Sequence, residues 1–300
     1  MTKSWRFDAC FAEARALYTR LESELGARFF RTTEVHRYCL NKADAKRARR
    51  RAANPRYSGV VADFAEAGEA GAAPAGITGT CGRLRLRPAA RVDLAVLRGA
   101  MLADFRARGR LREERFAHAA LHAARGGWAY GALRARTVTF CEGAGVRDNP
   151  WFRDLPFRPA KGETLRLDCP GLRLPDAVHQ HRKWIFPLPD GGFRVGATFV
   201  PGDEDPAPTE AGGRELLDAV AAFARLDGPP AIRAHAAGVR PCSADAKPIL
   251  GAHPEAPGLF VLNGLGAKGA TTAPLVSEVL ARHILRGAPI DPELSLLRFS

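Results

Sequence analysis

The chain has 300 residues, 46% of them hydrophobic, so it is long enough to bury the core of one large domain or of two interleaved domains. No run approaches the roughly 18 apolar residues of a membrane-spanning helix, and Met1-Thr2-Lys3 leads straight into an amphipathic pattern, which predicts a cytoplasmic protein without a signal peptide. The net charge of +13 makes a nucleic-acid partner an alternative to be weighed.

The cysteines and the basic residues each favour the simpler of two interpretations. Six cysteines are spread along the chain with no C-x-x-C pair, which argues against a zinc site and against a disulfide scaffold. The densest basic run, Lys46-Arg47-Ala48-Arg49-Arg50-Arg51, has no interleaved aromatic residue. We therefore expect reduced thiols and a solvated helix face, and nucleic acid is not the favoured partner.

The first third of the chain begins with a strongly periodic segment. Apolar residues from Phe7 to Leu25 recur at three and four residues, which predicts a helix that Gly26 ends. The elements expected after it are strands in Arg28 to Leu40, a basic helix or loop to about Arg56, a Gly/Ala-rich connector over 68–79, a short strand over Gly82 to Leu86, and a helix that opens at Val92-Asp93-Leu94 and stops at Gly109.

The middle of the chain alternates short strands with turns. Trp184 to Phe199, with Pro189-Asp190-Gly191-Gly192 at its centre, predicts a β-hairpin. The other elements expected here are short strands between Leu111 and Phe140, a glycine turn at Gly143 and Gly145, a strand over Gly162 to Leu167, a helix capped by Thr209 and running to about Leu226, and a strand from Ile232 to Val239.

Near the C-terminus a buried strand, Leu259 to Leu262, enters a glycine-rich turn that precedes a helix with Pro274 in its first turn. The turn matches the dinucleotide fingerprint G-x-G-x-x-G from Gly264 to Gly269. That fingerprint requires a second strand and an acidic residue about 20 positions later. Only one helix and a polar tail follow Gly269, so we expect a different reason for the glycines.

Five separated blocks supply that reason. Gly238-Val239-Arg240-Pro241, Asp245 to Gly251, His253-Pro254-Glu255, Gly258-Leu259-Phe260 and Asn263 to Gly269 resemble, in order and spacing, the C-terminal signature of FAD-dependent oxidoreductases of the D-amino-acid oxidase and glycine oxidase type. Lys161-Gly162-Glu163-Thr164-Leu165 and Trp184 to Phe199 resemble the substrate-domain strands of that family.

The resemblance implies an α/β (α+β) fold of two interleaved domains. An incomplete, Rossmann-like FAD-binding domain would comprise residues 1–28, 89–150 and 236–300. An antiparallel-sheet substrate domain would comprise residues 29–88 and 151–235. The implied cofactor is FAD, and the implied reaction is oxidation of a C–N bond in a small amine or amino acid by hydride transfer to the flavin.

The resemblance also implies a set of site residues. Asn263, Gly264, Leu265, Gly266, Ala267, Lys268 and Gly269 would lie beside the flavin ring, joined by Gly143 and Gly145. A helix start carries partial positive charge and free N–H donors, which suits the negative charge that develops on reduced flavin. Arg240 occupies the position of an arginine that binds the substrate carboxylate, with a structural pairing to Asp245 as the nearly equal alternative.

Other polar residues are weaker candidates. Lys183 and Lys247 are expected at the surface rather than at substrate or oxygen. His179-x-His181 has the spacing of a metal pair but no evident third ligand, so a solvated loop is favoured and no metal is expected. Hydride transfer needs orientation more than a strong base, and no general base is assigned.

The chain departs from the family pattern at its start. No strand, G-x-G-x-x-G and helix precede Trp5, as if about one βαβ unit were missing. Three explanations stay open: a mis-assigned start or fragment of a functional flavoenzyme, which is favoured; a remnant that cannot hold FAD; or a second polypeptide that supplies the nucleotide-binding unit. A basic nucleic-acid-associated module related to tRNA-modifying flavoenzymes is the alternative function.

Overall fold

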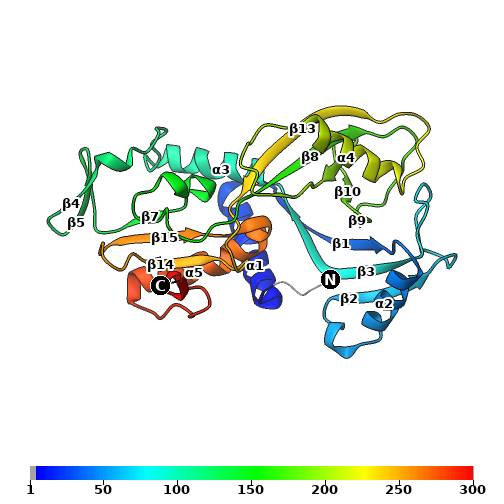
Figure 1. Cartoon of the computed structure of the whole chain (residues 1–300), viewed down its shortest axis with the longest axis horizontal. Helices are drawn as coiled ribbons and strands as arrows, with labels where there is room; N and C mark the ends of the chain where they lie inside the picture. Colours follow the sequence, from blue (N-terminus) through cyan, green and yellow to red (C-terminus); the bar gives the residue numbers. More distant parts are fainter. Residues whose placement is uncertain (1–4, 300) are drawn as a thin grey trace.

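The computed structural model describes residues 5–299 and shows an elongated, mixed α/β molecule built around three sheets (Figure 1). Its α-helices are α1 (Phe7–Leu25), α2 (Lys42–Ala52), α3 (Leu94–Ala107), α4 (Glu210–Ala221) and α5 (Gly269–Arg286). Its 3₁₀ turns are η1 (Pro55–Tyr57), η2 (His118–Ala120), η3 (Gly143–Asp148), η4 (Gly266–Lys268) and η5 (Leu296–Phe299). No helix within residues 5–299 is both long and apolar enough to cross a membrane.

The largest sheet has the strand order β12-β8-β11-β10-β9-β1-β3-β2, with β13 also paired to β8. Its strands are β1 (Phe30–Tyr38), β2 (Val61–Glu66), β3 (Gly82–Val92), β8 (Ala160–Asp168), β9 (Val178–Gln180), β10 (Trp184–Pro187), β11 (Phe193–Gly196), β12 (Val200–Pro201) and β13 (Ala231–Arg240). Alternate residues of β8 are buried, and Leu165 and Leu167 pack with Leu216 and Val220 of α4. This period of two places the core between the sheet and α4.

Two three-stranded sheets form the other end of the molecule. One has the order β14 (Ile249–Ala252), β15 (Leu259–Asn263), β7 (Val138–Phe140), with β15 and β7 parallel. The other joins β4 (Leu121–Ala124), β5 (Gly127–Tyr130) and β6 (Leu133–Ala135). Phe260 of β15 packs with Val276 and Leu280 of α5, so the apolar stripe of α5 covers the β14-β15-β7 sheet.

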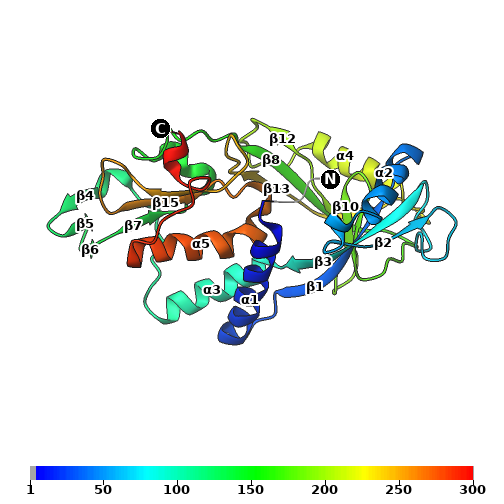
Figure 2. The ribbon, with the colours of Figure 1, turned by 90° about the horizontal axis from the view of Figure 1, so that it is seen from below.

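Helix α1 lies between the two ends of the molecule (Figure 2). Cys10, Ala14 and Tyr18 form its buried stripe, and Gly26 ends it with a φ of 63° that favours glycine. The hydroxyl of Tyr18 donates to the carbonyl oxygen of Ala270 in the first turn of α5 at 2.7 Å. Helix α1 therefore connects the large sheet to the helix on the small sheet.

Most predicted elements are confirmed. Helix α1 has the predicted limits, Asp93 and Thr209 cap α3 and α4 through their side chains, and the hairpin of β10 and β11 forms as expected. The segment after Tyr38 is a helix, α2.

Several boundaries differ from the prediction. Strand β3 continues to Val92 because it pairs with all of β1, and α4 ends at Ala221 rather than near Leu226. Pro274 is the sixth residue of α5 and not in its first turn. Strands β3 and β13 also run past the proposed domain limits at 88/89 and 235/236, and the division into two domains stays a prediction.

Candidate active site

The glycine-rich turn lies against the end of β13. Gly264 and Gly266 have φ values of 72° and 53°, which disfavour other residues. The N–H of Gly266 donates to the carbonyl oxygen of Pro241 at 3.2 Å, and Leu265 forms a β-bridge with Cys242. A Cβ atom on Gly264 would lie 3.2 Å from the carbonyl oxygen of Lys247. The turn is therefore fitted between two segments that follow β13.

Asn263 joins the turn to the segment after β7. Its side chain is 2% exposed; its Nδ2 donates to the carbonyl oxygen of Gly143 at 2.9 Å, and its Oδ1 accepts from the N–H of Gly264 at 2.8 Å. Two predicted cofactor segments are thus held together by one amide. Asn263 acts here as a brace between them, with its Oδ1 already satisfied.

The glycine turn predicted at Gly143 and Gly145 is the short 3₁₀ turn η3, which follows β7. Glu142 stabilises it, because its carboxylate accepts from Asn149 Nδ2 at 2.8 Å and pairs with His118 Nε2 at 2.7 Å. Gly143, with a φ of 59°, lies next to the ring of Pro241, so it faces the same junction as the C-terminal turn.

Helix α5 begins at Gly269 without a side-chain cap. The first N–H groups of a helix have no partner within it, and its start carries partial positive charge. Ala267 and Lys268 are exposed just before this start, and the part of the chain that the structure describes supplies no ion-pair partner for Lys268. The helix start is therefore available to an electron-rich group.

Arg240 ends β13 beside this turn. Its guanidinium donates to the carbonyl oxygens of Lys161 at 3.0 Å and Thr198 at 3.3 Å, and it lies over the ring of Phe199. It also packs across Gly162, where a Cβ atom would come within 2.1 Å of the guanidinium carbon. Gly162 is thus required for this position of Arg240.

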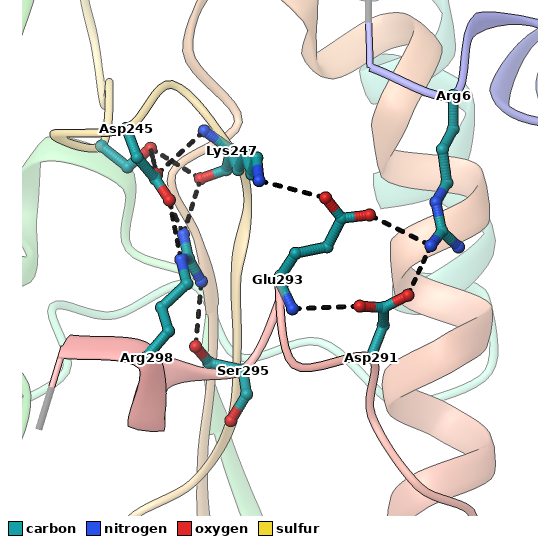
Figure 3. Close-up of polar contacts among 8 residues, drawn as sticks. Arg6, Asp245, Lys247, Asp291, Glu293, Ser295 and Arg298 are labelled. Atoms are coloured by element: carbon teal, nitrogen blue, oxygen red, sulfur yellow. Dashed lines mark hydrogen bonds and ion pairs between the residues drawn. The ribbon is translucent and has the colours of Figure 1, made fainter.

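The guanidinium of Arg240 has no acidic partner among residues 5–299, where its contacts are neutral carbonyls and an aromatic ring. Burial lowers its pKa, because a partly desolvated cation is destabilised. The alternative pairing with Asp245 is wrong. Asp245 accepts instead from Arg298 at 2.8 and 3.1 Å (Figure 3). A half-buried cation without a counter-ion favours an anionic ligand.

The weaker candidates have structural partners. Lys183 donates to the carbonyl oxygen of Ala197 at 3.0 Å and pairs with Glu215, whereas Lys247 pairs with Glu293 at 3.0 Å. These contacts account for both lysines without substrate.

The histidine pair was predicted to lie in a solvated loop, and this prediction is wrong. His179 is fully buried on β9, where Tyr38 Oη lies 2.8 Å from its Nδ1 and the carbonyl oxygen of Pro175 lies 2.9 Å from its Nε2. His181 stacks on Phe223. No cluster able to hold a metal ion is found among the described residues.

The basic run lies on α2, as expected for a solvated face. Ala45 and Ala48 are buried, while Lys46, Arg47, Arg49 and Arg50 are exposed. Arg47 pairs with Asp44 at 3.3 Å and Arg49 pairs with Glu66.

One feature beside the turn was not predicted. A cavity of about 350 Å³ adjoins Ala270 and Thr271 and is lined by side chains of α1, β1 and β3. Its aromatic residues on α1 were interpreted from the sequence only as the packing stripe of a helix. The only hint of the cavity in the sequence was that two aromatic residues of that stripe, Phe7 and Phe11, lie one helical turn apart.

Comparison with known proteins identifies the family. A family model described as FAD dependent oxidoreductase matches residues 3–283. The chain belongs to this family. The cofactor of the family is FAD, and the uncapped start of α5 with its glycine turn fits the electron-rich edge of a flavin ring.

Curated relatives fall into two groups. The bifunctional protein MnmC of tRNA 5-methylaminomethyl-2-thiouridine biosynthesis from Marinobacter nauticus is 32% identical over 173 residues, which are 51% of this chain and 26% of the relative. A glycine oxidase from Bacillus licheniformis is 33% identical over 142 residues, 47% of this chain and 38% of the relative. The chain therefore matches less than two fifths of the length of either relative.

Solved structures show the same fold over nearly the whole chain. Glycine oxidase from Geobacillus kaustophilus superposes with a TM-score of 0.83 at 22% identity, covering 99% of this chain and 84% of that one. Iminodiacetate oxidase from Chelativorans superposes with a TM-score of 0.78 at 24% identity, covering 98% and 85%. These similarities establish the glycine oxidase type of fold for this family member.

Proposed function

We propose that the protein oxidises a C–N bond of a small amine or amino acid. When bound, FAD supplies the hydride acceptor. The observation that carries the proposal is that Arg240, which has no acidic partner among residues 5–299, directly precedes Pro241. The carbonyl oxygen of Pro241 accepts from Gly266, in the glycine turn that leads into the uncapped start of α5. A carboxylate held at Arg240 would sit at the same junction as the glycine turn.

Different residues of this chain would stabilise the flavin and orient the substrate. Backbone donors at the start of α5, within Gly264 to Ala270, would stabilise negative charge on the pyrimidine edge of the flavin, with the cation of Lys268 nearby. Arg240 would orient the substrate by a bidentate contact to its carboxylate, which suits a transfer that depends on alignment. No described residue is assigned as a general base.

The proposal is tested by flavin binding and by flavin reduction. FAD fluorescence titration gives the affinity, and anaerobic addition of amino acids should bleach the visible absorbance of the bound flavin. Gly266→Ala should weaken FAD binding, because its Cβ would lie 3.3 Å from Cys242 Sγ at a φ of 53°. Gly287→Ala is the matched control, with a φ of 66° but open space around its Cβ. If no amine reduces the bound flavin, or if FAD still fails to bind when a strand, G-x-G-x-x-G and helix unit is supplied at the N-terminus, the proposal is overturned.

A second candidate is oxidation of an amine within a modified tRNA base. Two observations favour it: relatives include proteins named for tRNA 5-methylaminomethyl-2-thiouridine biosynthesis, and the net charge is +13. A phosphate footprint would make tRNA affinity fall steeply between low and physiological salt. Affinity that is weak at both salt concentrations would exclude the tRNA substrate and leave a free amine or amino acid.

A further inference from the structure

The cavity beside the start of α5 has a wall without charged side chains. Its volume is about 350 Å³, and it lies where α1, β1, β3 and the first turn of α5 meet. Five aromatic residues contribute to the wall: Phe7, Phe11, Tyr18, Phe30 and Tyr57. The other lining residues are alanines, a proline, aliphatic residues and Thr271. Ligand pockets are of this size and predominantly apolar.

The polar atoms of this wall are few. The hydroxyl of Tyr18 already donates a hydrogen bond to the carbonyl oxygen of Ala270 at 2.7 Å. That carbonyl is free to accept it because Pro274, four residues later, has no N–H to complete the helical hydrogen bond. The cavity is partly open to solvent, so a charged group inside it would lose part of its hydration without gaining an ionic partner. The cavity therefore favours a neutral, apolar occupant.

The position of the cavity connects it to the proposed reaction. Ala270 and Thr271, which line it, are the second and third residues of α5, the helix whose start faces the proposed flavin edge. Arg240 does not contribute to the wall. A carboxylate bound at Arg240 and an apolar group in the cavity would therefore occupy separate places.

The size of the cavity argues against a substrate as small as glycine. An engineered apolar cavity of about 150 Å³ is enough to bind benzene. The cavity here is more than twice that volume, which admits a bicyclic aromatic group such as indole. Glycine has no side chain to fill it and would gain nothing from its apolar wall.

We propose that this cavity binds a neutral aromatic or large aliphatic group of the amine substrate, so that the enzyme prefers bulky apolar amines or amino acids to glycine. The inference rests on the proposed function. Ala90 of β3, paired with Thr32 of β1, is the position at which a larger side chain would fill the cavity. Substitution at Ala90 therefore tests whether the volume of the cavity determines substrate size.

The experiment uses indole as a probe and a matched pair of variants. Ala90→Leu should weaken indole binding to the FAD-loaded protein roughly tenfold, because the added methyl groups occupy the cavity. The same variant should lower kcat/KM for phenylalanine by a similar factor and leave glycine unaffected. Ala236→Leu, at an exposed position on β13 of the same sheet, should change neither. Phe11→Ala, which enlarges the cavity, should shift preference further toward bulky amines.

The outcomes separate this inference from the proposed function. If FAD displaces indole rather than binding beside it, the cavity belongs to the cofactor and the inference is wrong. If amines are oxidised but glycine is used as well as phenylalanine, with Ala90→Leu without effect, the function stands and the inference fails. If no amine is oxidised at all, the proposed function itself fails.

Discussion

Arg240 is the residue whose surroundings most directly indicate a ligand. Two neutral carbonyls and an aromatic ring hold its guanidinium, and no carboxylate in residues 5–299 neutralises it. We expect Arg240→Leu to raise KM for an amino acid about 30-fold or more, since a charge-assisted bidentate contact contributes roughly 2–3 kcal/mol. Steady-state kinetics with an amino acid and with the corresponding amine lacking a carboxylate measure the effect.

The control is Arg233→Leu, which removes an exposed arginine of the same strand that pairs with Asp168. It should leave KM unchanged. An equal rise in KM for the amino acid and for the amine would show that Arg240 supports the fold rather than the carboxylate.

His179 makes stability depend on pH. Burial lowers its pKa to about 4, since the charged ring would be desolvated beside Tyr38 and near His36. The unfolded chain therefore binds more protons than the folded one between pH 4 and the usual histidine pKa of about 6.5. Stability is highest above that window and falls as the pH drops through it, by roughly 3 kcal/mol from this residue.

Urea unfolding at several pH values checks this dependence. Burial also lowers the pKa of His36 and of His181. The contribution of His179 is therefore obtained as the difference in the pH dependence of unfolding free energy between the native protein and His179→Gln. His122→Gln, at an exposed histidine, should leave the slope unchanged. A His179→Gln variant with the same pH slope as the native protein would refute the assignment.

The C-terminal segment after α5 braces the glycine turn from behind. Arg298 donates to the carboxylate of Asp245 and, at 3.2 Å, to the carbonyl oxygen of Lys247 (Figure 3). That carbonyl faces Gly264. Burial is the largest single effect on Asp245 and would raise its pKa. The hydrogen bonds from Arg298, from the N–H of Lys247 and from Ser243, together with the charge of Arg298, outweigh it, so the pKa is lowered.

We expect Arg298→Ala to destabilise the protein by about 2 kcal/mol, because hydrogen bonds to charged groups contribute roughly 1.5–3 kcal/mol and the Arg298 side chain is only 12% exposed. Arg282→Ala, which breaks an exposed pair with Glu278 on α5, should cost less than about 1 kcal/mol. Urea unfolding compares the two variants. Equal effects would mean that the C-terminal segment does not brace the turn.

The elements with a local signal were predictable from the sequence. The stripe of α1, the caps Asp93 and Thr209, and the Asp-Gly hairpin are each encoded by a few neighbouring residues. The full length of β3 was not, because its second half is defined by pairing with the start of β1, about 60 residues earlier in the chain. Local β-propensity does not indicate which distant strand a segment pairs with.

The candidate site shows the same limit. The glycine turn and Arg240 were found from sequence blocks, but the brace of Asn263 on Gly143 joins residues 120 positions apart. The cavity is assembled from α1, β1, β3 and α5, so its alanines and aromatic residues carry no common sequence signal. The partner of Asp245 likewise lies 53 residues away, in Arg298.

At the scale of the whole molecule, the proposed site lies where its two ends meet. The glycine turn follows β15 of the small sheet, whereas Arg240 belongs to β13 of the large one (Figure 1). Helix α1 links both, through the hydrogen bond from Tyr18 to Ala270 and the packing of Tyr18 with Phe29 just before β1. A ligand held at this junction contacts both parts and should stabilise them together.

FAD should therefore raise the stability of both ends equally, by about 2.7 kcal/mol when its concentration is about 100 times Kd. Tryptophan fluorescence reports on each end separately, because Trp128 and Trp151 pack together in the aromatic core near β5, whereas Trp184 lies on β10. Urea unfolding of Trp184→Phe follows the small-sheet end, where Trp5 also packs. Unfolding of a variant with Trp5, Trp128 and Trp151 all changed to Phe follows the large sheet. A shift confined to one end would place the cofactor on that end alone, because a ligand bound across the junction must be released when either end unfolds.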